Sequence, residues 1–129
     1  MLQVIFGIFL ILHGLVHLLW FVVPWQITEV DGLPYSTTIL AGRIDLGSGG
    51  IRFVGLLWIL GTIAFVVGGV GLLLSAPWWW TVTFASAIYS IFLCLLGWSD
   101  SKWGALIDVI IVAVLLIGSQ FTLSFLPFP

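Results

Sequence analysis

Residues 53–99 read FVGLLWILGTIAFVVGGVGLLLSAPWWWTVTFASAIYSIFLCLLGWS and contain no charged side chain over 47 positions. A transmembrane helix needs about 20 apolar residues to cross a hydrocarbon core of about 30 Å, so this run is long enough for two helices. Ser75-Ala76-Pro77 supplies a turn between them, because proline suits the first position of a new helix. The sequence predicts one span at about 51–74 and a second at about 78–98.

Two further apolar segments flank this pair. The first runs from about 2–23 and ends at Pro24, which cannot continue a helix. The last runs from about 104–126. The longest segment outside the spans is the loop at 24–50. The fold class that we predict is all-α, an integral membrane four-helix bundle, with residues 1–129 forming one domain.

The composition excludes several classes of protein. Hydrophobic residues make up 62% of the chain and charged residues 6%, whereas soluble domains carry about 25% charged residues. A net charge of -2 without a basic patch argues against a nucleic-acid partner. The one cysteine, Cys94, excludes an internal disulfide and a multi-cysteine metal centre. The uncharged stretch 1–28 lacks a basic start, so we expect a retained first span rather than a secretory signal.

The number of spans predicts a topology. With four spans both termini share one side, and the loops at 24–50 and 98–104 share the other. All three basic residues, Arg43, Arg52 and Lys102, lie on the loop side. The positive-inside rule predicts that this side is cytoplasmic.

Tryptophan favours the membrane–water interface, where an apolar ring meets a wet edge. Six tryptophans fall at predicted span ends, and we expect them to form two interfacial bands: Trp25, Trp98 and Trp103 at the loop end, and Trp78, Trp79 and Trp80 at the other.

The glycine-rich run Gly47-Ser48-Gly49-Gly50 suggests a phosphate cradle at first sight. No G-x-x-x-x-G-K-[ST] pattern accompanies it, and no soluble nucleotide-binding domain surrounds it. We therefore expect a flexible turn at this run.

Small residues recur at helical spacing in three of the spans. Helices in lipid associate through close backbone approach, so such stripes mark packing faces and predict a tight bundle. The stripes comprise Gly7 and Gly14 in the first span, Gly61, Ala64, Gly68 and Gly71 in the second, and Thr83, Ser86, Ser90, Cys94 and Gly97 in the third.

Three ionisable residues lie within the predicted spans: His13, His17 and Asp108. Such residues are costly in hydrocarbon and usually face the bundle interior with a partner, so we expect Asp108 to avoid lipid. The histidines are four residues apart and share one helix face. At about 1.5 Å per residue, His17 lies about 9 Å and Asp108 about 6 Å below the loop side, which permits a hydrogen bond between them. His13 lies deeper, near Ser90 and Thr62.

Three roles remain open for these side chains. The first is structural hydrogen bonding inside the bundle. The second is binding of a metal by the two histidines, or axial ligation of a haem or chlorin by His13 or His17. The third is a proton or solute path, in which the face carrying Ser86, Ser90 and Cys94 lines a polar cavity. We expect the Cys94 thiol itself to be buried and inert, because no basic residue lies near it in the sequence.

Three short motifs resemble those of a widespread family of small bacterial four-helix membrane proteins. They are His13-Gly14-Leu15-Val16-His17, then Arg52 before Gly55-Leu56-Leu57-Trp58, then Ser99-Asp100-Ser101-Lys102-Trp103-Gly104. The resemblance covers all four spans and implies a fold more than an activity, since members often carry permease-like or uncharacterised names. The chain departs from the family by a longer first loop, and by Asp108 where a neutral amide is expected.

Charged residues gather near the loop-side membrane boundary, namely His17, Arg52, Asp100, Lys102 and Asp108. Arginine pairs bidentately with carboxylates. The simplest interpretation is a salt-bridge network that holds helix ends, and the alternative is a site for an anion or a headgroup.

The function that we predict is a non-catalytic accessory or assembly subunit of a larger complex in a bacterial cytoplasmic membrane, with other membrane proteins or a second copy as partner. The chain has little outside the spans and no strong catalytic set, so we do not expect an enzyme. The alternatives are a haem- or chlorin-binding subunit of a photosynthetic or respiratory assembly, and a small-solute or proton permease that works as an oligomer.

Overall fold

The computed structural model describes residues 1–98, 100–121 and 126–128 and contains four helical spans. The first span is divided between two helices, so five helices make up the four spans. All four are long and apolar enough to cross a membrane, which confirms the predicted all-α membrane bundle. The elements are α1 (Leu2–Val16), α2 (Leu19–Val22), β1 (Thr38–Ile39), β2 (Ile44–Asp45), α3 (Gly47–Leu73), α4 (Trp79–Leu96) and α5 (Lys102–Phe121).

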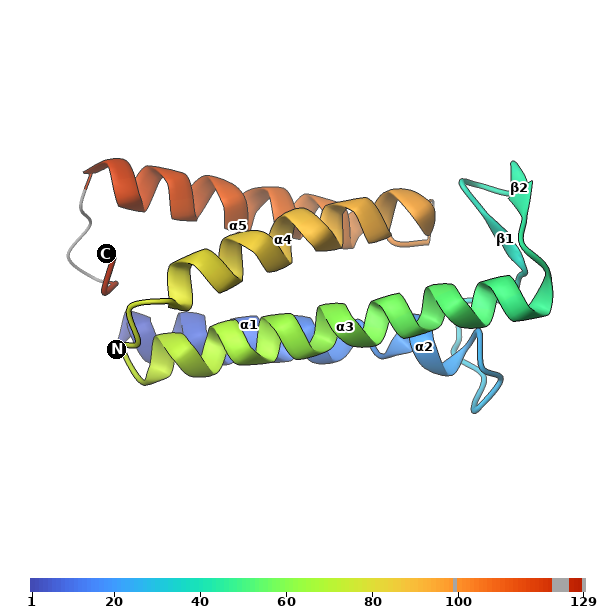
Figure 1. Cartoon of the computed structure of the whole chain (residues 1–129), viewed down its shortest axis with the longest axis horizontal. Coiled ribbons are helices and arrows are strands. Elements are labelled where there is room, and N and C mark those ends of the chain that lie inside the picture. The colour runs from blue at the N-terminus through green and yellow to red at the C-terminus, as the bar shows by residue number, and fades with distance from the viewer. Residues whose placement is uncertain (99, 122–125, 129) are drawn as a thin grey trace.

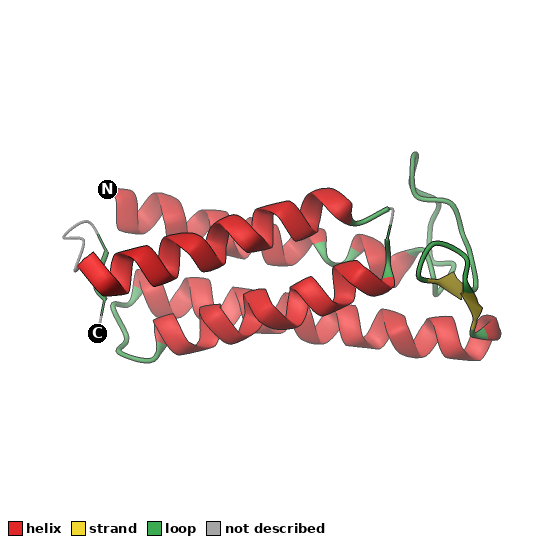
Figure 2. Cartoon of the chain, turned by 90° about the horizontal axis from the view of Figure 1, so that it is seen from above, coloured by secondary structure: helices red, strands yellow, loops and turns green. Residues whose placement is uncertain are grey.

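The helices pack in the order α1, α3, α4, α5, with α2 continuing α1 along α3. Figure 1 shows both termini at one end of the bundle, together with the turn between α3 and α4. The β1–β2 hairpin and the α4–α5 connection lie at the other end (Figures 1 and 2). This arrangement agrees with four spans whose termini share one end of the bundle.

The first span is not the continuous helix that we predicted over 2–23. It breaks at His17 and Leu18, between α1 and α2. The amide of His17 donates to the carbonyl of Gly14 at 3.1 Å and that of Leu18 donates to Leu15 at 3.0 Å. These bonds span three residues instead of four, so they tighten the last turn of α1.

The predicted flexible turn at 47–50 is wrong, because these residues form the first turn of α3. Asp45 stabilises the N-terminus of α3. Its carboxylate accepts the amide of Gly47 at 2.9 Å and the hydroxyl of Thr37 at 2.8 Å. These hydrogen bonds, the one from Gly47 first, lower the pKa of the Asp45 carboxyl below its ordinary value. The hairpin that precedes α3 has two residues in each strand, too few for a period-2 pattern to predict it.

Glycines bring α1 and α3 into close contact, as the small-residue stripes predicted. A Cβ atom on Gly14 would lie 2.7 Å from Cβ of Phe65, and one on Gly69 would lie 2.8 Å from the carbonyl oxygen of Gly7. A side chain at either position would push the two helices apart. Gly61 is likewise buried, against His17 and α4, and Gly68 is buried against Thr83 of α4.

The two expected tryptophan bands are only partly present. Trp78, Trp98 and Trp103 are exposed, but Trp79 is fully buried. Its indole nitrogen donates to the carbonyl of Pro127 at 2.8 Å, and that of Trp80 donates to Leu115 at 3.1 Å. Trp79 therefore packs inside the bundle, and Trp80 is half-buried against α5.

The last span begins at Lys102, two residues before the predicted start, and is helical to Phe121. The predicted continuation to 126 falls partly on residues 122–125, which lie outside the described residues, as does Ser99 of the third motif.

Candidate functional site

A buried hydrogen bond joins α1 to α5 inside the bundle. Nε2 of His13 lies 2.8 Å from Oδ1 of Asp108. The Asp108 side chain is fully buried and that of His13 is 7% exposed. The carboxylate therefore avoids lipid, as predicted, and has a polar partner.

The partner of Asp108 is not the one that we expected. The depths that we estimated from the sequence favoured His17 as the hydrogen-bond partner, but the structure pairs Asp108 with His13. Because α5 begins at Lys102, Asp108 lies about 9 Å into the helix rather than about 6 Å. This deeper position brings it nearer the level of His13, the histidine farther from the loop end.

His17 is held by two other groups. Its Nδ1 lies 2.9 Å from the carbonyl oxygen of His13, and its Nε2 lies 2.7 Å from Oγ of Ser90 on α4. A carbonyl only accepts, so Nδ1 carries the proton and donates. In the neutral ring Nε2 then accepts from the Ser90 hydroxyl. His17 thus connects α1 to α4, while His13 connects α1 to α5.

The second carboxylate oxygen of Asp108 has a weaker partner. Sγ of Cys94 lies 3.7 Å from Oδ2, and the thiol is a weak donor. The backbone carbonyl of Cys94 accepts a hydrogen bond from Ser101 at 2.8 Å. The sequence identified Cys94 as buried, which is confirmed, but gave no sign that it touches Asp108.

Aromatic rings from α3 surround the two imidazoles. The ring of Phe65 stands edge-on to His13 at 4.9 Å and tilted to His17 at 5.3 Å. Trp58 lies 5.2 Å from His17 and stacks on Trp20 at 5.0 Å. From the sequence we named Trp58 only as part of a motif and did not include Trp20 or Phe65. A spacing of seven residues places Trp58 and Phe65 on one face of α3. This spacing is the sequence signal that could have identified both rings as neighbours.

Among the described residues, Arg52 and Lys102 at the loop end contact aromatic rings and do not form the salt-bridge network that we considered. The guanidinium of Arg52 lies 5.5 Å from the ring centroid of Trp25, and the ammonium of Lys102 lies 5.7 Å from that of Trp103. Both are cation–π contacts at exposed positions. Within the described part of the chain, neither these cations nor Asp100 belongs to a salt bridge.

The polar face of α4 is packed. Thr83, Ser86, Ser90 and Cys94 are each at most 2% exposed. Ser86 donates to the carbonyl of Val82 at 2.7 Å, within its own helix. Thr83, Ser90 and Cys94 fill helix contacts, whereas Ser86 also lines a largely apolar surface hollow of about 350 Å³ between α3 and α4.

The histidines do not fit a haem or chlorin in this arrangement. An axial ligand must direct a ring nitrogen at the metal, with space for the macrocycle. Nε2 of His13 faces Asp108, and both nitrogens of His17 are hydrogen-bonded. A Cβ atom on Gly61 would lie 3.1 Å from the His17 ring, so no gap exists there. Among the described residues, no three His, Cys, Asp or Glu side chains are arranged to hold a metal ion.

The geometry thus describes a buried polar connection among three of the four spans. Comparison of the chain with family models, curated proteins and solved structures finds no match.

Proposed function

We propose that this chain is a non-catalytic accessory subunit of a larger membrane assembly, and that it receives a helix of a partner protein between α1 and α5. The observation that carries the proposal is an open groove between these two helices. α1 packs closely on α3, α3 on α4, and α4 on α5. Among the described residues, α1 and α5 lack a comparable contact. A closed four-helix bundle would bring its first and last helices together.

The α1/α5 groove has a volume of about 350 Å³. Apolar side chains line it throughout, which suits a membrane-spanning segment and not a polar solute. The lining residues are Leu2, Ile5, Phe6, Phe9, Val114 and Leu126.

Aromatic packing and one hydrogen bond support a fixed shape for this groove. The rings of Phe6 and Phe9 stack at 6.1 Å, and Phe9 stacks on His13 at 5.9 Å. The hydrogen bond from His13 to Asp108 then joins the two walls. Helix association in lipid depends on shape and close packing rather than on the hydrophobic effect, so a rigid groove favours a helix over mobile acyl chains.

Site-specific photocrosslinking in native membranes tests the proposal. A benzophenone side chain at Phe9, in the groove, is expected to give one discrete adduct with another membrane protein. The matched control is the same side chain at Ile63, which is exposed on α3 outside this groove and is expected to give lipid adducts only.

A second measurement makes the result decisive. Phe9→Trp overfills the groove, so it should reduce the mass of the particle extracted in mild detergent, whereas Ile63→Trp should not. Lipid adducts at both positions, together with the mass of a single chain for the wild type, would contradict an accessory role through this groove.

A further inference from the structure

A second cavity lies at the loop end of the bundle, away from the His13–Asp108 pair. Its volume is about 60 Å³, well above the roughly 10–15 Å³ needed for one water. Residues 33–39 form one wall, and the helix residues that line it come from α2, the first turns of α3 and the end of α4. Because α4 ends at Leu96, the cavity lies near the ends of the spans, where lipid headgroups meet water.

One group in this cavity is a buried donor without a partner. The indole nitrogen of Trp20 makes no hydrogen bond with any residue that the structure describes, although it is shielded from solvent. Most buried polar groups are paired, so an orphaned N–H needs an explanation. An indole only donates, and a molecule that satisfied it would therefore present an oxygen acceptor.

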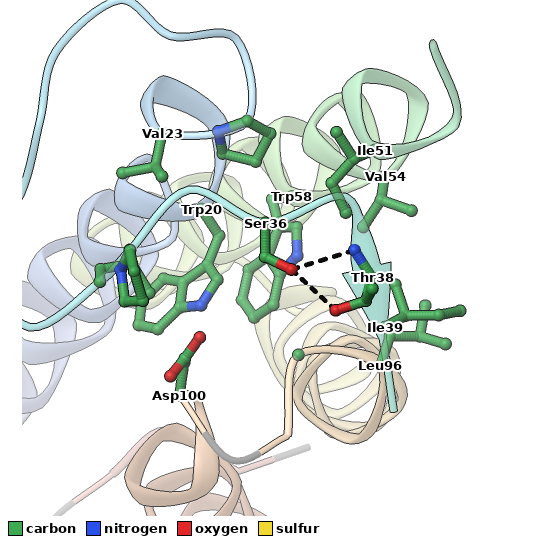
Figure 3. A pocket seen from close by; sticks show the side chains of 14 residues that line it. Trp20, Val23, Ser36, Thr38, Ile39, Ile51, Val54, Trp58, Leu96 and Asp100 are labelled. Carbon is green, nitrogen blue, oxygen red and sulfur yellow. Dashed lines mark hydrogen bonds between the residues drawn. The ribbon is translucent and has the colours of Figure 1, made fainter. Parts of the chain in front are cut away.

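The opposite wall supplies an acceptor. Figure 3 shows the carboxylate of Asp100 pointing from the α4–α5 connection toward the rings of Trp20 and Trp58. Within the described part of the chain, Asp100 has no hydrogen bond or salt bridge from a side chain. Ser36, by contrast, is already paired with the hydroxyl of Thr38 at 2.7 Å. An ionised carboxylate only accepts, so the group that met Asp100 would be a donor or a cation.

The surrounding charge favours a cation. A larger hollow of about 550 Å³ adjoins the cavity and shares Val23, Leu33 and Pro34 with it. Glu29 and Asp31 line that hollow, and no lysine or arginine lines either space. A concave surface that carries one sign of charge raises the local concentration of the opposite ion.

We propose that this cavity binds a small primary ammonium compound that also carries an oxygen acceptor, such as ethanolamine. The ammonium donates to Asp100, and the oxygen accepts from Nε1 of Trp20. The carbon atoms between them lie against the apolar walls. The same chemistry occurs in the free amino alcohol and in the ethanolamine headgroup of a phospholipid, and the position near the span ends suits both.

Nuclear magnetic resonance of the full chain in a neutral detergent tests the site directly. With ¹⁵N-labelled tryptophan, the indole signal of Trp20 is assigned from its loss in Trp20→Phe. Ethanolamine is expected to shift this signal saturably, and Asp100→Asn should raise the dissociation constant at least tenfold, because a charge-assisted hydrogen bond is lost. Ethylamine, which lacks the oxygen, should bind more weakly than ethanolamine.

Matched variants keep the result interpretable. Gln120→Ala alters an exposed side chain of α5 that lines neither space and should leave ethanolamine binding unchanged. If the indole signals of the other tryptophans are the same in Asp100→Asn as in the wild type, the variant has kept the fold.

Nanodiscs separate the two sources of the ligand. If the headgroup is bound, the Trp20 signal should differ between phosphatidylethanolamine and phosphatidylglycerol nanodiscs and should not respond to added ethanolamine in the former. If the free amine is bound, ethanolamine should shift the signal in both. A Trp20 signal that responds to neither ethanolamine nor phosphatidylethanolamine, or that responds equally in Asp100→Asn, would overturn the proposal.

Discussion

At the scale of single residues, the buried Asp108 has the strongest influence on the interior of the bundle. A charge at the centre of a span costs about 2.5–3.5 kcal/mol on insertion scales. The hydrogen bond to His13 and the thiol of Cys94 offset part of that cost. The pair therefore specifies how α1 and α5 meet more than it stabilises the protein, because a buried ion pair gains little over well-packed apolar side chains.

A double-mutant cycle tests this view. His13→Leu leaves Asp108 buried without its main partner, so it should lower the free energy of unfolding by about 3–5 kcal/mol. The double variant His13→Leu/Asp108→Leu removes both polar groups and should be destabilised less than His13→Leu alone. Denaturation in mixed micelles measures the wild type, His13→Leu, Asp108→Leu and the double variant, which complete the cycle. If the double variant is less stable than His13→Leu by the full cost of a second independent mutation, the two side chains are not coupled.

At the scale of the helices, the contact between α1 and α3 depends on backbone approach. Gly14 lies against Phe65, whose Cβ atom is bonded to the main chain and cannot rotate away. The neighbouring residue, His13, forms the hydrogen bond to Asp108 on α5. The position of α1 on α3 therefore also sets the geometry of the His13–Asp108 pair.

Alanine at Gly14 should separate the two helices. Its Cβ would lie 2.7 Å from Cβ of Phe65. The expected loss is about 1–3 kcal/mol in the free energy of unfolding, the usual cost of overpacking. Gly49→Ala is the matched control in α3, because nothing lies within 4 Å of its added Cβ and alanine favours a helix. Equal stability of the two variants would show that close approach at Gly14 does not matter.

At the scale of the whole molecule, the arrangement of the ends defines a topology. The termini and the α3–α4 turn lie at one end, and the long loop and the α4–α5 connection lie at the other (Figure 1). The spans expose apolar side chains on their outer faces, as lipid requires.

Accessibility labelling checks this topology in sealed vesicles. Cysteines placed at Leu2 and Ser75 should react with a membrane-impermeant maleimide from one side only, and those at Tyr35 and Asp100 from the opposite side only. All four side chains are exposed, while the native Cys94 is buried and should not react. Labelling of positions 35 and 75 from the same side would refute four spans.

The number of spans, their approximate limits and the need to bury His13, His17 and Asp108 followed from the sequence alone. These properties depend on the local run of apolar residues and on the transfer cost of single side chains, and both can be read without knowing any neighbour. The small residues at Gly7, Gly14, Gly61 and Gly68 likewise predicted close helix contacts for a local reason.

Only the tertiary structure decided which groups meet. The pairing of Asp108 with His13 depends on where α5 begins, and the pairing of His17 with Ser90 depends on the rotation of α4. The inward turn of Trp79 and the cavity between Trp20 and Asp100 arise where segments distant in sequence converge. A shift of one residue rotates a helix face by about 100° and moves it by about 1.5 Å, which is more than a hydrogen bond tolerates, and composition does not specify that shift.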